Sequence, residues 1–138
     1  MNILIMDGQG GQLGGQLVKA ILSKFPGNKI LAVGTNATAT ATMLKAGAHQ
    51  AATGENPAIV ACRKADVIVG PIGIVIADAL YGEITPTMAV AVAQADAVRI
   101  LLPVNKCDNL IAGVPDLTVT TLISDVLVKL TGILKENS

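Results

Sequence analysis

The sequence contains very few aromatic side chains, with no Trp, one Tyr and one Phe. Proteins that bind single-stranded nucleic acid stack bases on aromatic rings, so this composition excludes such a platform. The 10 basic and 10 acidic residues cancel, and no run of basic residues interrupts the chain. Nothing therefore attracts a polyanion or an anionic membrane surface, and we expect neither nucleic acid nor a membrane as a partner.

Cysteine, histidine and long apolar runs are also scarce. The chain holds 2 cysteines and 1 histidine, too few for a disulfide framework or for a His-based metal site, so we expect no metal. Gly, Pro and charged residues break every apolar run before the roughly 18 residues that a membrane-spanning helix needs. The N-terminus lacks a basic region and soon enters a glycine loop, which is unlike a signal peptide, and we expect a cytoplasmic protein.

Aliphatic side chains are the most abundant kind in the sequence. Hydrophobic residues account for 51% of the chain, nearly all Ala, Val, Ile and Leu, which suits strands buried on both faces of a parallel sheet. A length of 138 residues fits one domain, and we take 1–138 as a single unit. So apolar a chain at zero net charge is expected to self-associate as a homo-oligomer, in the simplest case a dimer.

Strand-like and helix-like segments alternate along the chain. Strands are predicted at 2–6, 29–34, 49–52, 66–70 and 98–104, with a short sixth strand at 110–114. Helices are predicted from Leu13, over 37–46, from Asn56 to Ala65, over 74–81, from Thr85, and over 119–134. Asn36, Asn56 and Thr85 are the expected N-caps. The order predicts an α/β fold, a doubly wound and mainly parallel sheet of five to six strands with helices on both faces, Rossmann-like in architecture.

A glycine-rich loop joins the first predicted strand to the first predicted helix. Glycines at positions 8, 11 and 14 form a G-x-x-G-x-x-G pattern, with a further glycine at position 10. In this setting glycines allow a tight turn, close approach of a ligand to the backbone and close packing of helix on strand, while the helix N-terminus attracts an anion. The predicted ligand contacts here are Gly8, Gln9, Gly10, Gly11, Gln12 and Gly14. A glycine turn that serves packing alone remains the alternative.

Other loops at the carboxyl ends of the strands complete the predicted site. Thr35 and Asn36 follow the second strand, where they could bond a ribose or cap the next helix. That position holds neither an acid nor an Arg, so it does not choose between NAD and NADP. Gly70, Pro71 and Gly73 follow the fourth strand and would close the far side. The predicted ligand is a phosphate-containing small molecule, NAD(P) or another nucleotide.

Asp7 stands where a phosphate would be bound. A carboxylate about 4 Å from a phosphate would cost roughly 4 kcal/mol at an effective dielectric of 20. We therefore expect Asp7 to turn back and accept N–H groups of its own loop. The alternatives are a cation between the two groups, or a ligand without phosphate at this point.

Four residues could carry chemistry if the chain is an enzyme acting on a small anionic metabolite. Lys106 could bind the anion, while Glu55, Asp7 or Cys107 could act on a proton or as a nucleophile. Each residue also has a purely structural interpretation. Lys106 could be a solvated lysine and Cys107 a small loop residue. Glu55 could be a carboxylate at a helix start, and Asp7 a carboxylate at a glycine turn. Cys62 is expected in the core. A non-catalytic module that assembles through its apolar surface is the third hypothesis.

Two resemblances add to these predictions. Over about the first 36 residues, the G-x-x-G-x-x-G loop is similar to that of atypical short-chain dehydrogenases of the NmrA-like kind and their inactive relatives. That family's chemistry needs Tyr-x-x-x-Lys, whereas here Tyr81 is followed four positions on by Thr85, so its hydride transfer is not implied.

The second resemblance covers nearly the whole chain. It is to a bacterial family of short Rossmann-like proteins known as a domain of unknown function, and it implies a fold but no activity. It is carried by the segments DGQGG at 7–11, AVGTN at 32–36, ATGEN at 52–56, GPIGIVIAD at 70–78 and PVN at 103–105.

Overall fold

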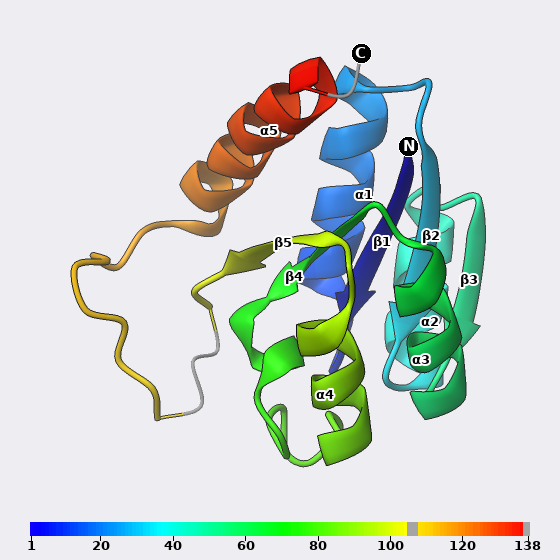
Figure 1. The fold of residues 1–138 in the computed structure, drawn as a ribbon, viewed down its shortest axis with the longest axis vertical. Coiled ribbons are helices and arrows are strands. Elements are labelled where there is room, and N and C mark those ends of the chain that lie inside the picture. Colours follow the sequence, from blue (N-terminus) through cyan, green and yellow to red (C-terminus); the bar gives the residue numbers. More distant parts are fainter. Residues whose placement is uncertain (105–107, 137–138) are drawn as a thin grey trace.

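The computed structural model describes residues 1–104 and 108–136 and contains one parallel sheet of five strands. The strands are ordered β3-β2-β1-β4-β5, with β1 in the centre (Figure 1). The chain therefore builds outward from β1 to β3, then returns across the sheet to β4 and continues to β5. Their bounds are β1 Asn2–Asp7, β2 Lys29–Gly34, β3 Gln50–Thr53, β4 Val67–Pro71 and β5 Val98–Leu102.

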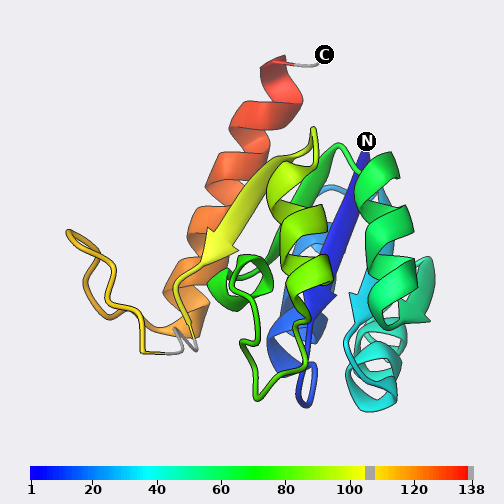
Figure 2. The same cartoon turned by 60° about the horizontal axis from the view of Figure 1, so that its bottom comes forward.

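Helices cover both faces of this sheet. Helices α1 and α5 pack together on one face with α2 beside α1, and α3 and α4 pack together on the other (Figures 1 and 2). This is the doubly wound, Rossmann-like α/β arrangement that the sequence predicted. The helices are α1 Gln12–Lys24, α2 Ala37–Lys45, α3 Glu55–Lys64, α4 Pro86–Gln94 and α5 Val119–Glu136, with a 3-10 turn η1 at Ile72–Val75.

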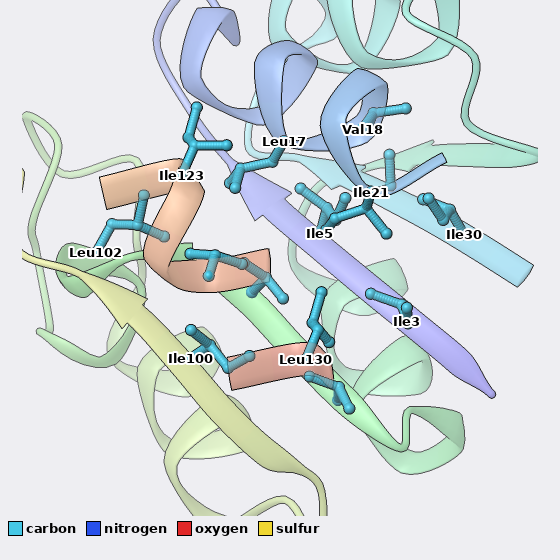
Figure 3. Close-up of a cluster of buried hydrophobic side chains, with 14 of the residues drawn as sticks. Ile3, Ile5, Leu17, Val18, Ile21, Ile30, Ile100, Leu102, Ile123 and Leu130 are labelled. Atoms are coloured by element: carbon cyan, nitrogen blue, oxygen red, sulfur yellow. The ribbon is translucent and has the colours of Figure 1, made fainter. Parts of the chain in front are cut away.

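Each face of the sheet has its own aliphatic core. Ile3 and Ile5 point toward α1 and α5, where Leu17, Ile21 and Leu130 pack against them (Figure 3). The alternate residues of β1, Leu4 and Met6, belong to the core under α3 and α4. Both sets of side chains are fully buried, which explains why β1 is apolar at consecutive positions rather than at every second one. Within the described ranges, no helix is both long and apolar enough to cross a membrane.

Two predicted helix starts are confirmed and a third is displaced. Asn36 Oδ1 accepts the N–H of Ala39 at 2.8 Å, and Thr85 Oγ1 accepts the N–H of Met88 at 3.1 Å. The prediction that Asn56 caps α3 is wrong, because the helix begins at Glu55 with Gly54 as its N-cap. Pro57 still falls in the first turn, where a missing N–H costs nothing.

Two predicted elements are wrong. Residues 74–81 do not form an α-helix; after η1 the chain turns, with positive φ at Asp78, Leu80 and Tyr81. Ala79, Leu80 and Ile84 are nevertheless buried in the α3–α4 core, so their apolar pattern reflects a packed loop. Residues 110–114 form no strand, and Leu110 is 93% exposed on a segment that leads away from the sheet (Figures 1 and 2).

Candidate functional site

The glycine loop lies where the direction of strand addition reverses. It follows β1, which pairs with β2 on one side and β4 on the other. Ligands of open α/β sheets bind outside the carboxyl ends of the strands at this point. A pocket of about 430 Å³ opens beside the loop, and its opposite wall is formed by Val104, which follows β5, and Val119, which begins α5. Residues 7–13 and Gln16 form the rest of its lining.

Asp7 turns back into the loop, as predicted. Its Oδ1 accepts the N–H of Gly8 and its Oδ2 accepts the N–H of Gly14, both at 2.8 Å. The residue is buried, with 6% of its surface exposed. Burial raises the pKa of Asp7 above its ordinary value, the two N–H bonds pull it down, and the charge of Glu83 raises it further.

Glu83 closes the loop from the other side, and the sequence reasoning missed it. Its Oε1 accepts the N–H of Gln9 at 3.0 Å, the hydroxyl of Thr35 at 2.5 Å and the side-chain amide of Asn36 at 2.7 Å. One carboxylate oxygen therefore joins the loops that follow β1 and β2 to the segment before α4. Partial burial raises the pKa of Glu83, but the bonds from Thr35, Gln9 and Asn36 outweigh it, and the pKa lies below its ordinary value.

One feature of the sequence distinguishes Glu83. It is the only charged residue between Asp78 and Asp96, in a stretch that is otherwise apolar or neutral. An isolated acid beside Gly82 indicates a specific role, but the pattern does not say which loop it reaches. Only the turn at 76–84, which folds back over the sheet edge, brings it to Thr35 and Asn36.

Thr35 and Asn36 are thus occupied within the chain. Asn36 donates its amide to the carbonyl of Gln9 and to Glu83, while its oxygen caps α2. The capping alternative raised from the sequence is confirmed for Asn36. Contact of either residue with a ligand stays a prediction, and it requires Glu83 to move away.

Three backbone N–H groups of the loop have no hydrogen-bond partner among the described residues. They belong to Gly10, Gln12 and Leu13, at the turn and at the first two positions of α1. The first N–H groups of a helix cannot bond within it and carry its positive dipole end. All three residues line the pocket.

The loop glycines divide into packing positions and one open position. A Cβ on Gly11 would lie 2.7 Å from the backbone of Ala39, and one on Gly14 would lie 2.5 Å from Met43 Sδ. At Gly8 it would lie 2.6 Å from Thr35 Oγ1. These three positions are explained by the close approach of α2 and β2, as the packing alternative held. Among the loop glycines, only at Gly10 would a Cβ have no atom of the described residues within 4 Å.

The ligand contacts predicted at the end of β4 and in η1 do not line the pocket. Gly70, Pro71 and Gly73 are all buried. A Cβ on Gly70 would lie 2.4 Å from the carbonyl oxygen of Met6, so this glycine permits close approach of β4 to β1. A ligand contact at these positions stays a prediction.

The remaining candidates that the structure describes are absent from the pocket lining. Glu55 lies exposed at the start of α3 and is absent from the pocket lining. Lys106 and Cys107 lie outside the described residues, and the enzyme hypothesis that uses them stays a prediction. Cys62 is buried in the core, as predicted, and burial raises the pKa of its thiol. His49 Nδ1 accepts the N–H of Ile30 at 3.0 Å, a structural role.

Comparisons with known proteins bear on the family and the fold. A dodecameric FMN-dependent UbiX-like decarboxylase from Escherichia coli O157:H7 is similar over 94% of each chain, with 16% identity and a TM-score of 0.46. A similarity of this size says nothing about activity. No curated protein matches the sequence, and the resemblance to NmrA-like dehydrogenases stays a prediction. The model of the family described as a domain of unknown function, DUF3842, matches residues 2–135, and the chain belongs to this family.

Proposed function

We propose that this protein binds a small phosphate-containing ligand of the nucleotide type, with the phosphate at the N–H groups of Gly10, Gln12 and Leu13. The observation that carries the proposal is the pocket of about 430 Å³, which is lined by the three residues that bear these unpartnered donors. Donors, helix dipole and cavity coincide at the sheet edge where such ligands bind.

The position of Glu83 sets the direction in which the ligand extends. In dinucleotide-binding sheets the ribose lies over the end of the second strand. Here that place is taken by the Glu83 carboxylate on Thr35 and Asn36. The ligand would instead run from the loop toward Val104 and Val119, which favours a mononucleotide over NAD or NADP.

The electrostatics of the pocket limit how much charge it accepts. Among the described residues of its lining, Asp7 is the only charged one, and both of its oxygens are already bonded to loop N–H groups. The phosphate would therefore be held by backbone donors and the dipole of α1, with no basic side chain among the described lining residues. Ligands with one phosphate should bind more tightly than triphosphates.

Thermal unfolding with added ligands tests the proposal. We expect AMP or FMN to raise the melting temperature, and NAD, NADP and ATP to do so less. A ligand present at 100 times its Kd adds about 2.7 kcal/mol to the free energy of unfolding. If none of the five compounds changes the melting temperature, the proposal is contradicted.

A matched pair of glycine variants locates the effect. A Cβ has open space at Gly10 and also at Gly27, which lies in the turn after α1. Gly10→Ala should fold normally but lose the ligand-induced shift, because its methyl group enters the space before the donors. Gly27→Ala should keep the shift. A full shift in Gly10→Ala would place the ligand elsewhere.

A further inference from the structure

A second cavity, of about 250 Å³, lies at the opposite edge of the sheet, between α3 and the strands β1, β2 and β3. Apart from Ile3, whose side chain belongs to the core under α1 and α5, the strand residues that line it alternate along the chain and project from the face that α3 covers. The register places Asn2 beside Lys29, and Leu4 beside Leu31. It also places Val33 beside Ala52. None of its lining residues belongs to the pocket at the glycine loop.

The side of α3 that borders the cavity carries few bulky apolar side chains, which leaves space between the helix and the sheet. Pro57, Val60, Ala61, Lys64 and Ala65 line it, at i, i+3, i+4, i+7 and i+8 spacing, and no large aliphatic residue is among them. The opposing sheet is small as well at Ala52. Leu31 shows the result, because it is only half-buried although its strand is flanked on both sides.

The cavity has an apolar body and a polar edge. Its body is lined by aliphatic side chains such as Leu4, Leu31 and Val60. Lys29 begins β2 and Lys64 ends α3, so both lysines belong to the same edge of the sheet, with Asn2 and Gln50.

The charge at this edge favours an anion. No acidic residue lines the cavity, and neither lysine forms an ion pair with any residue that the structure describes. Asp66 lies nearby outside the lining, where its carboxylate accepts the N–H of Asn2 at 2.7 Å. Two cations at the mouth of an apolar cavity match a ligand with an anionic head and an apolar body.

We propose that this cavity binds a small aliphatic monocarboxylate, with its hydrocarbon chain between α3 and the sheet and its carboxylate at the mouth with Lys29 and Lys64. The volume sets the size of the chain, since an apolar cavity of roughly 150 Å³ admits benzene. A cavity of about 250 Å³ accommodates an acid of roughly six to eight carbons.

A titration of the protein with butanoate, hexanoate and octanoate, followed by amide NMR, tests the site directly. We expect shifts at Leu31, Ala52 and Val60, and a Kd that falls about fourfold for each added methylene until the cavity is full. Hexylammonium, which has the same chain and the opposite charge, should bind at least tenfold more weakly than hexanoate. Equal affinity for the two ions, or no dependence on chain length, would overturn the proposal.

Charge-matched variants separate the two lysines from net charge. The double variant Lys29→Gln, Lys64→Gln should raise the Kd for hexanoate at least tenfold. The control Lys19→Gln, Lys45→Gln removes the same charge from exposed positions on α1 and α2, and should leave the Kd unchanged. An equal rise in the Kd for hexanoate in both double variants would show that net charge alone causes the effect, and would overturn the proposal.

A cavity-filling variant tests the apolar part without touching a charge. Ala52→Val places two more carbons in the cavity and suits a strand, so the variant should fold with the wild-type melting temperature or above. Octanoate should lose more affinity than butanoate. NMR shifts that instead appear at Gly10 to Leu13 would assign the acid to the glycine loop and overturn the proposal.

Discussion

Two carboxylates organise the glycine loop at the level of single residues. Asp7 accepts N–H groups from both ends of the loop, and Glu83 accepts the one at Gln9 between them. The loop donors that an anion could use are thereby reduced to those of Gly10, Gln12 and Leu13. The two carboxylates also repel each other, which is one cause of the raised pKa of Asp7.

Removing the charge of Glu83 should lower the pKa of Asp7. In Glu83→Gln, the pKa of Asp7 should fall, because the charge of Glu83 is one of the causes that raise it. A carboxyl-carbon NMR titration measures this directly. Glu55→Gln, at an exposed acid on α3, is the control and should leave the Asp7 titration unchanged.

The same variant has a consequence for stability against pH. Because the pKa of Asp7 is raised on folding, its contribution is present below pH 3.8 and is lost as pH rises through the raised pKa. Glu83 has the opposite sign, since its contribution is present above pH 4.5 and is lost as pH falls through its lowered pKa. The advantage of the wild type over Glu83→Gln should therefore shrink below pH 4.5. An advantage that grows as the pH falls below 4.5 would contradict these assignments.

Gly11 is the loop position where a side chain costs most. It has φ of +75°, and a Cβ would lie 2.7 Å from the backbone of Ala39. Gly11→Ala should lower the free energy of unfolding by at least about 2 kcal/mol, from left-handed strain and the contact with α2. Urea unfolding measures the loss. Gly10→Ala, in open space, should change it by less than about 0.5 kcal/mol.

At the scale of elements, the caps decide where helices start. α4 shows this best, because Thr85 bonds the N–H of Met88 and Pro86 follows it in the first turn. The sequence predicted this start correctly, since the cap and the proline act locally. The failure at residues 74–81 has the opposite cause, because burial of Ala79 and Leu80 under α4 holds a turn with positive φ.

Truncating the cap of α4 should destabilise the protein. Thr85→Ala leaves the N–H of Met88 without its acceptor and should cost about 1 kcal/mol in chemical denaturation. Thr87→Ala, exposed within the same helix, should cost nothing or stabilise slightly because Ala is the better helix former. Equal effects at the two positions would show that the cap contributes little.

At the scale of the whole molecule, the sheet separates two aliphatic cores and leaves apolar side chains outside. Leu110 is 93% exposed, Val128 64% and Val98 50%, on the β5 and α5 side of the fold. They fit the homo-oligomer that the composition predicts.

Light scattering checks the oligomeric state. The chain has a mass of 14.0 kDa, and we expect a measured mass of at least twice that value in the micromolar range. Burial of apolar surface at zero net charge is the reason. A mass of one chain at every concentration would contradict the expectation.

The sequence by itself determined the fold class, the five strands of the sheet and the back-turned Asp7, because these depend on aliphatic periodicity, glycine turns and local caps. Tertiary structure alone decided which loop donors stay open. Glu83 reaches Gln9, Thr35 and Asn36 across 74, 48 and 47 positions of chain. It likewise decided the cavity under α3, whose walls come from three strands and a helix. Long-range packing joins such residues, and no local pattern in the chain encodes their meeting.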